Sequence, residues 1–203
     1  MNKHGFRTWL ALAVAAAAIG AGATLWTVRG PLAAHSTPSS GAPAKSLVYT
    51  ASWPRAYAGI ADLARAADVV VVGTVTGSQP FTETIGNKYP TTIHETNFNV
   101  SVSRVLKGSA SQGSSITVRQ TGGGGAQVSD DPSFVNGATY LLFMSYSESQ
   151  RVYTVLSGPF GRFVVNRDTV EDLHHAYPAL AITDTNVNGI SLDQVQTEVA
   201  TAG

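Results

Sequence analysis

Four residues near the end of the chain have the spacing of a calcium-binding loop: Asp184, Asn186, Asn188 and Gly189. Such a loop needs a glutamate at its twelfth position to supply two oxygens, and that position holds Val195. Asp184 and Asp193 are the only carboxylates in these twelve residues, too few for tight calcium binding. The segment therefore predicts an Asn-Gly turn, followed by Ser191 as the N-cap of a final helix.

The stretch TGGGGAQVSDDPSFVNG, residues 121–137, is the longest predicted loop, and loops longer than about 12–15 residues are often functional. Backbone amides at its glycines can approach a ligand, but the Gly-Lys-Ser/Thr ending of a phosphate loop is missing. The adjacent acids offer a cation site or, more commonly, a solvated turn. The aromatic residue of this stretch, Phe134, either packs over an end of the barrel or contacts a partner. Our predicted binding residues are Gly123, Gly124, Asp130, Asp131 and Phe134.

Histidines and serines give no catalytic or metal pattern. His174 and His175 are adjacent, and His94 stands beside Glu95; neighbouring side chains point apart and rarely bind one metal together. No GxSxG or SxxK motif ties a serine to a base. We therefore predict no metal, no cofactor and no catalytic residue.

Composition excludes further classes of site. The chain has no cysteine, so it has no disulfide, thiolate ligand or cysteine nucleophile. Its formal net charge is zero, but three of the 13 basic residues precede Ser36, which leaves a net charge of about −3 on the remainder. A negative body argues against nucleic acid, whose binding depends on Lys and Arg.

The N-terminal segment indicates export. Lys3 and Arg7 precede an uncharged run from Thr8 to Val28, as in a signal peptide. Its 21 residues also have the length of a membrane span, so residues 1–29 are a cleaved signal peptide or a retained anchor. Residues 30–46 are rich in Pro, Ser and Ala and predict a disordered linker. Either outcome places the body outside the cytoplasm, secreted or tethered, touching the membrane only through this segment.

Apolar periodicity predicts a helix over about residues 55–66 and a buried strand over 69–76. In TNFNVSVSRVLKG the apolar and polar residues alternate until Val105 and Leu106 break the phase, which indicates a β-bulge. Further strands are expected in SSITVRQT, ATYLLFMSYS and RVYTVLS, the last two paired, and in a hairpin of GRFVV with TVE. Ser191 and Gln194 give the capping box of a C-terminal helix.

These elements predict a mainly β fold over residues 47–203. The expected architecture is a small OB-like antiparallel β-barrel of five to six strands, with a flanking N-terminal helix and a C-terminal helix. A barrel is the economical arrangement because it leaves few exposed strand edges.

The succession ADVVVVGTV, RVLKG, ITVRQTGGG, NGATYLLF, GPFGRF and GISLDQV resembles a family of exported bacterial proteins of uncharacterised role. That family is similar to the netrin-like domain of the tissue inhibitors of metalloproteinases, an OB-type barrel. The likeness spans about residues 57–200. The animal inhibitors bind protease zinc through an N-terminal cysteine, which this chain lacks. Their helix between the third and fourth barrel strands is also not visible, and the glycine-rich stretch stands in its place.

The sequence as a whole predicts an exported, non-catalytic interaction module at the bacterial cell envelope. Its partner is an unknown extracytoplasmic protein or envelope component. Two alternatives stay open: an exported hydrolase with its site near the Gly122–Gly137 loop, and a protease inhibitor that works without cysteine.

Overall fold

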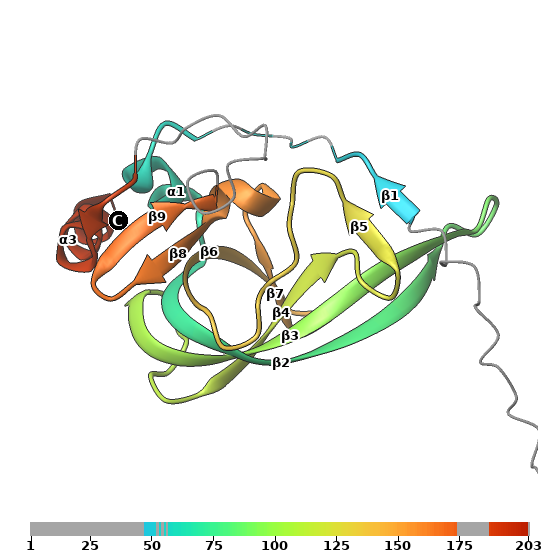
Figure 1. Ribbon diagram of the computed structural model, residues 1–203, viewed down its shortest axis with the longest axis horizontal. Helices are drawn as coiled ribbons and strands as arrows, with labels where there is room; N and C mark the ends of the chain where they lie inside the picture. The colour runs from blue at the N-terminus through green and yellow to red at the C-terminus, as the bar shows by residue number, and fades with distance from the viewer. Residues whose placement is uncertain (1–46, 52, 54, 56, 174–186, 203) are drawn as a thin grey trace, which may run out of the picture. The chain divides into compact units, whose positions relative to one another are not determined.

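The structure, a computed structural model, describes residues 47–51, 53, 55, 57–173 and 187–202 (Figure 1). The predicted signal or anchor segment, the predicted linker and the pair His174–His175 lie outside these residues. Among the described residues, no helix is long and apolar enough to cross a membrane.

The described chain is mainly β, as predicted. Its strands are β1 (Leu47–Tyr49), β2 (Val69–Ile85), β3 (Thr91–Lys107), β4 (Ser115–Thr121), β5 (Ala126–Val128), β6 (Thr139–Ser147), β7 (Val152–Val155), β8 (Arg162–Asn166), β9 (Thr169–Asp172) and β10 (Ile190–Ser191). Its helices are α1 (Ile60–Ala66), the short 3-10 helix η1 (Gly158–Gly161) and α3 (Leu192–Ala202). The N-terminal helix is therefore shorter than the predicted residues 55–66, whereas β2 and β3 are longer than expected.

Eight strands form one sheet in the order β10-β9-β8-β6-β2-β3-β4-β7, and β1 pairs with β5 in a separate two-stranded sheet. Because β7 also pairs with β6, the hydrogen-bonded pairs lead from β6 through β2, β3, β4 and β7 back to β6. The predicted count of five to six strands is too low for this sheet. The prediction of purely antiparallel pairing is also wrong, since β4–β7 and β1–β5 are parallel.

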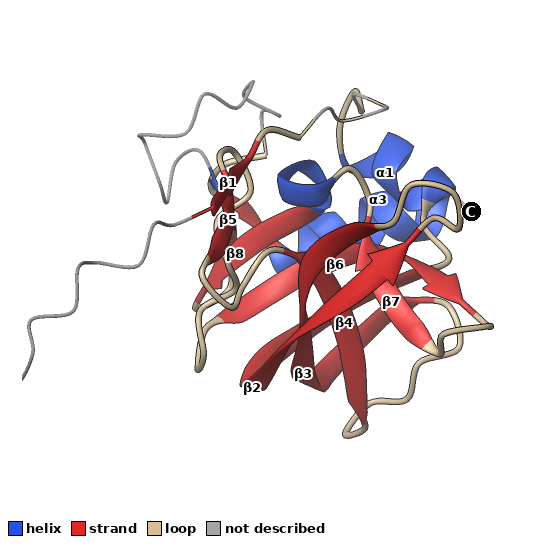
Figure 2. Cartoon of the chain, turned by 90° about the vertical axis from the view of Figure 1, so that its right-hand side faces the viewer, coloured by secondary structure: helices blue, strands red, loops and turns tan. Residues whose placement is uncertain are grey.

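Two apolar cores lie on opposite faces of β2 and β6. Val70, Val72 and Phe143 face the first core, which the helices α1 and α3 cover (Figure 2). Val71 and Leu142 face the second core, which also contains the apolar side chains of β3 and β4. The sequences VVVV and YLLFM are apolar without alternation because both faces of each strand are buried.

The predicted β-bulge is confirmed. Val70 pairs with Lys107 and Val71 with Val105, so Leu106 is an extra residue on β3. Val105 consequently packs against the second core and Leu106 against the helix-covered core. A bulge of this kind bends a strand and increases its twist. The bend lets β3 contribute side chains to both cores.

The turn before α3 is also confirmed. The Ser191 hydroxyl accepts a hydrogen bond from the backbone N–H of Gln194 at 3.2 Å, as an N-cap does. The Asn188 side chain accepts from the backbone N–H of Asp172 at 2.8 Å and donates to its carboxylate at 3.1 Å. Two of the residues spaced like calcium ligands, Asp184 and Asn186, lie outside the described residues. Asn188 therefore ties the turn to the end of β9, in keeping with a structural role.

Candidate functional site

The stretch from Gly122 to Gly137 is an ordered arch rather than a plain loop. It contains the three-residue strand β5, which was not predicted, and two antiparallel bridges, Gly123 to Ala126 and Val128 to Asp131. All of the residues between β4 and β6 are described, and none of them is in a helix.

The glycines at the start of the arch have different roles. A Cβ on Gly123, whose φ is +100°, would lie 1.9 Å from the Thr96 hydroxyl on β3. That hydroxyl donates to the carbonyl of Gly122 at 2.8 Å, so this part of the arch lies directly on β3. Gly124 is exposed and has φ +58°. Gly123 is thus required for packing, whereas Gly124 forms the tip of a turn.

The arch lines a cavity of about 460 Å³ that is open to solvent. Its lining residues are Gln120, Thr121, Gly122, Gly123, Gly125, Ala126, Gln127, Val128, Ser129, Asp131, Pro132 and Ser133. Of the five predicted binding residues, the cavity brings together Gly123 and Asp131 but not Gly124, Asp130 or Phe134. A second cavity of about 180 Å³ adjoins it through shared residues of β4 and through Asp131.

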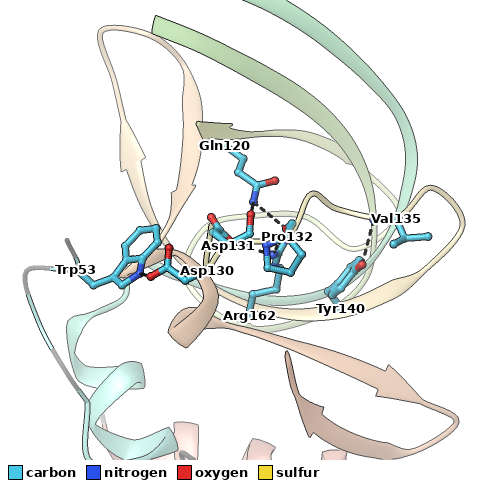
Figure 3. A network of polar contacts seen from close by, with 8 residues as sticks. All are labelled: Trp53, Gln120, Asp130, Asp131, Pro132, Val135, Tyr140 and Arg162. Carbon is cyan, nitrogen blue, oxygen red and sulfur yellow. Dashed lines mark hydrogen bonds and ion pairs between the residues drawn. The ribbon is translucent and has the colours of Figure 1, made fainter. Parts of the chain in front are cut away.

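Asp131 is fixed by a buried ion pair with Arg162, the first residue of β8 (Figure 3). The guanidinium Nη2 donates to Asp131 Oδ1 at 2.8 Å and also to the Pro132 carbonyl. The two residues are only 7 % and 1 % exposed. Burial raises the pKa of the Asp131 carboxyl, and the charge of Arg162 offsets part of that rise. Asp131 therefore holds the arch in place.

Asp130 points to a different partner from its neighbour. Its carboxylate accepts a hydrogen bond of 2.7 Å from the indole N–H of Trp53 (Figure 3). Asp130 and Asp131 thus do not converge on one point as the ligands of a shared cation would. The solvated turn expected for this pair is wrong for Asp131, because the distant Arg162 compensates its charge inside the protein.

Phe134 is a core residue. It is 6 % exposed, and its ring lies 5.0 Å from that of Phe98 and 5.1 Å from that of Tyr140. Arg162 lies 4.1 Å from the Phe134 ring centroid, within the range of a cation–π contact. Of the two roles considered for this aromatic residue, the structure shows the plug.

A second charged cluster, which sequence reasoning missed, lies on β2, β3 and β4. Arg119 is 3.6 Å from Glu95 and 3.8 Å from Glu83, and its guanidinium lies 4.9 Å from the Phe81 ring centroid. Burial raises the pKa of Glu95, Arg119 opposes the rise, and Glu83 adds to it. Glu95 and Arg119 line the smaller cavity. Only the strand register brings these residues together, and no pattern in the neighbouring sequence predicts the cluster.

His94 is the one histidine among the described residues. Its side chain makes no hydrogen bond to a serine or carboxylate there, and its backbone carbonyl accepts a hydrogen bond from the Gly122 N–H at 2.7 Å. Within the same residues, no three His, Asp or Glu side chains are grouped as metal ligands would be. Among the described residues, the arch therefore contains no serine or carboxylate paired with a histidine, the arrangement that the hydrolase alternative requires.

No known protein-family profile and no curated protein matches this chain. The resemblance to exported bacterial proteins and to the netrin-like domain therefore stays a prediction. The described structure defines a mainly β protein with a cavity-forming arch between β4 and β6.

Proposed function

We propose that this chain is an exported, non-catalytic interaction module of the bacterial cell envelope, built on an OB-type β-barrel. Its partner is an extracytoplasmic protein or envelope component that contacts the Gly122–Gly137 arch. The observation that carries the proposal is the arch itself, which is held by the Asp131–Arg162 ion pair and lines an open pocket of about 460 Å³.

The strand pairings support the OB-type barrel. Five strands, β6, β2, β3, β4 and β7, form a continuous circuit of hydrogen-bonded pairs. Five strands is the number in an OB-type barrel. The second core occupies the interior of this circuit, and β8 to β10 extend the sheet beyond it.

The hydrogen bonds that hold the arch support binding. Asp131 and Pro132 are bonded to Arg162, and Gln120 Nε2 donates to the Pro132 carbonyl at 3.0 Å. A site organised before binding loses less conformational entropy when it meets a ligand. The lining combines polar side chains, such as Gln120 and Gln127, with apolar ones, such as Val128, so it suits a ligand that has both hydrogen-bonding and apolar groups.

The N-terminal segment supports export, and the negative charge of the remaining chain argues for a protein rather than a nucleic-acid partner. Lys3 and Arg7 followed by 21 uncharged residues resemble an export signal or anchor. The remaining chain carries a net charge of about −3, which is unfavourable for binding the phosphates of nucleic acid.

Site-specific photo-crosslinking in the cells that produce the protein tests the proposal. A photoreactive amino acid replaces Gln127, an exposed residue at the cavity, in the full-length chain; the control replaces Gln196, an exposed residue on α3. We expect a discrete crosslinked product from position 127 that position 196 does not give, and mass spectrometry identifies the partner. Equal products from both positions, or none from position 127, would contradict a partner at the arch.

A further inference from the structure

The arch already holds one extended segment, which comes from its own chain. β1 pairs in parallel with β5, with Leu47 opposite Ala126, and the two strands lie side by side in Figure 1. Leu47 N–H donates to the Gly125 carbonyl, and Ser129 N–H donates to the Tyr49 carbonyl, each at 3.0 Å. Extended peptides commonly bind by adding a strand to an exposed edge in this way.

Beyond β1, an aromatic side chain anchors the same segment. Trp53 Nε1 donates to Asp130 Oδ2 at 2.7 Å (Figure 3). The indole also packs on the backbone of Gly158 so closely that a Cβ there would lie 2.2 Å from a ring atom. The backbone of β5, the carboxylate of Asp130 and the surface of Gly158 together form a receptor for an extended segment, here termed the strand groove.

Residues 47–49 are a poor match for the strand groove. Leu47 is 49 % exposed and Val48 is 62 % exposed, so their side chains gain little from burial. The Tyr49 hydroxyl is buried and has no hydrogen-bond partner among the described residues, which costs free energy. Backbone hydrogen bonds, which any extended peptide can supply, therefore provide most of the attachment of β1.

We propose that the strand groove is a binding site for an extended peptide of a partner protein, and that β1 and Trp53 occupy it until that partner displaces them. The preferred peptide carries an apolar residue where this chain has Tyr49 and an aromatic N–H donor where it has Trp53. A second copy of this chain would bring the same unpaired hydroxyl, so it gains nothing over the segment already present. The inference rests on the proposed function, because it names the chemistry of a partner at the same arch.

Fluorescence anisotropy with the full-length protein in mild detergent tests the proposal. The probe is a fluorescein-labelled peptide of residues 47–53 that carries Tyr49→Phe. We expect Trp53→Ala in the protein to tighten peptide binding by about ten-fold or more, because the competing segment loses its anchor. Adding Asp130→Ala should weaken binding by about ten-fold, because the acceptor for the indole is lost. Adding Asp193→Ala on α3 instead is the matched control and should change nothing.

Two further variants keep the test decisive. Tyr49→Phe in the protein should weaken binding of the peptide, because the internal segment then fits better. Trp53→Phe keeps the ring without the N–H donor and replaces Trp53→Ala if that variant fails to fold. A peptide of the same composition in scrambled order is the control ligand.

In the titration, the Trp53→Ala protein is added up to about 1 mM. The proposal is overturned if the peptide binds this protein no better than the scrambled peptide does. It is equally overturned if Trp53→Ala produces a concentration-dependent dimer in sedimentation, since the occupant is then a second copy. A crosslinked partner at Gln127 without peptide binding contradicts only this inference. Peptide binding without any crosslinked partner contradicts only the proposed function.

Discussion

Arg162 and Arg119 lie beside the same arch and face the same kinds of group, carboxylates and an aromatic ring. Arg162 is 1 % exposed, 2.8 Å from Asp131, and 4.1 Å from the Phe134 ring centroid. Arg119 is 16 % exposed, and its two carboxylates lie at 3.6 and 3.8 Å. The difference between them is the access of water rather than the type of partner.

This difference separates a structural pair from a cluster that a ligand can reach. A fully desolvated charge depends on its partner, because leaving it unpaired costs several kcal/mol. A partly hydrated pair contributes little, because water replaces the lost contact. The arch is therefore anchored at Arg162, whereas Arg119 divides its charge between the mostly buried Glu95 and the more exposed Glu83.

The largest expected effect comes from breaking the buried pair. Arg162→Met should lower the free energy of unfolding by about 3–5 kcal/mol, because Asp131 is left buried without its counter-charge. Denaturant unfolding measures the loss. Arg119→Met is the matched control and should cost less than Arg162→Met, because one of its two carboxylates, Glu83, is 42 % exposed to water.

The double variant Arg162→Met with Asp131→Leu tests the reason for this loss. Removing both charges should recover much of the lost stability, since replacing a whole buried ion pair by apolar residues is often neutral. If the double variant is as unstable as Arg162→Met alone, the cost lies in packing rather than in the uncompensated charge.

A smaller effect is expected where the arch lies on β3. Gly123→Ala should cost about 1–3 kcal/mol, because strain at positive φ is combined with a clash against Thr96. Gly125→Ala is a close control: its φ is +94° against +100°, and a Cβ there meets nothing within 4 Å. Thermal unfolding of both variants isolates the clash, and equal losses would rule it out.

The half-buried cluster around Arg119 should make the free energy of unfolding depend on pH. Burial raises the pKa of Glu95 from its ordinary value of 4.5, so the folded protein keeps a proton that the unfolded chain has released. The contribution of Glu95 to the free energy of unfolding therefore falls as the pH rises from about 4.5 through the raised pKa. Glu95→Gln should remove this slope, so the stability of the variant relative to the original protein increases over that window. Glu198→Gln on α3 is the control, which tests whether the loss of any carboxylate removes the same pH dependence.

The smallest effect is expected at Glu83, whose side chain is 42 % exposed and 3.8 Å from Arg119. Glu83→Gln should change the free energy of unfolding by less than about 0.5 kcal/mol, and the change should vanish at high salt. A larger, salt-insensitive loss would mean that the Arg119 cluster is structural like the Arg162 pair.

Local patterns predicted much of the fold. The apolar runs of β2 and β6, the bulge at Leu106 and the Ser191 cap each depend on residues close together in sequence, so a short window contains the whole signal. The arch was located as the longest loop for the same reason. Its strand β5 was not predicted, because three residues pairing with a distant β1 leave no periodic pattern.

The charged groups around the arch could not be predicted in the same way. Asp131 and Arg162 are 31 residues apart, and nothing near Arg162 in GRFVV indicates that its charge is buried. Glu83, Glu95 and Arg119 meet only because of the register of three strands, which tertiary pairing determines. Phe134 was considered both as a core plug and as a surface contact, and only its neighbours Phe98 and Tyr140 decide between these.

Because β2 and β6 contribute to both cores, the two layers share their central backbone. An opening event that releases one core also removes support from the other, so the amides of residues 70–72 and 141–143 should exchange with solvent only through global unfolding. The far half of β2, where most residues of 77–85 are exposed, should exchange through local fraying. One strand should thus contain both strongly and weakly protected amides, and we expect its midpoint to mark the edge of the cooperative folding unit.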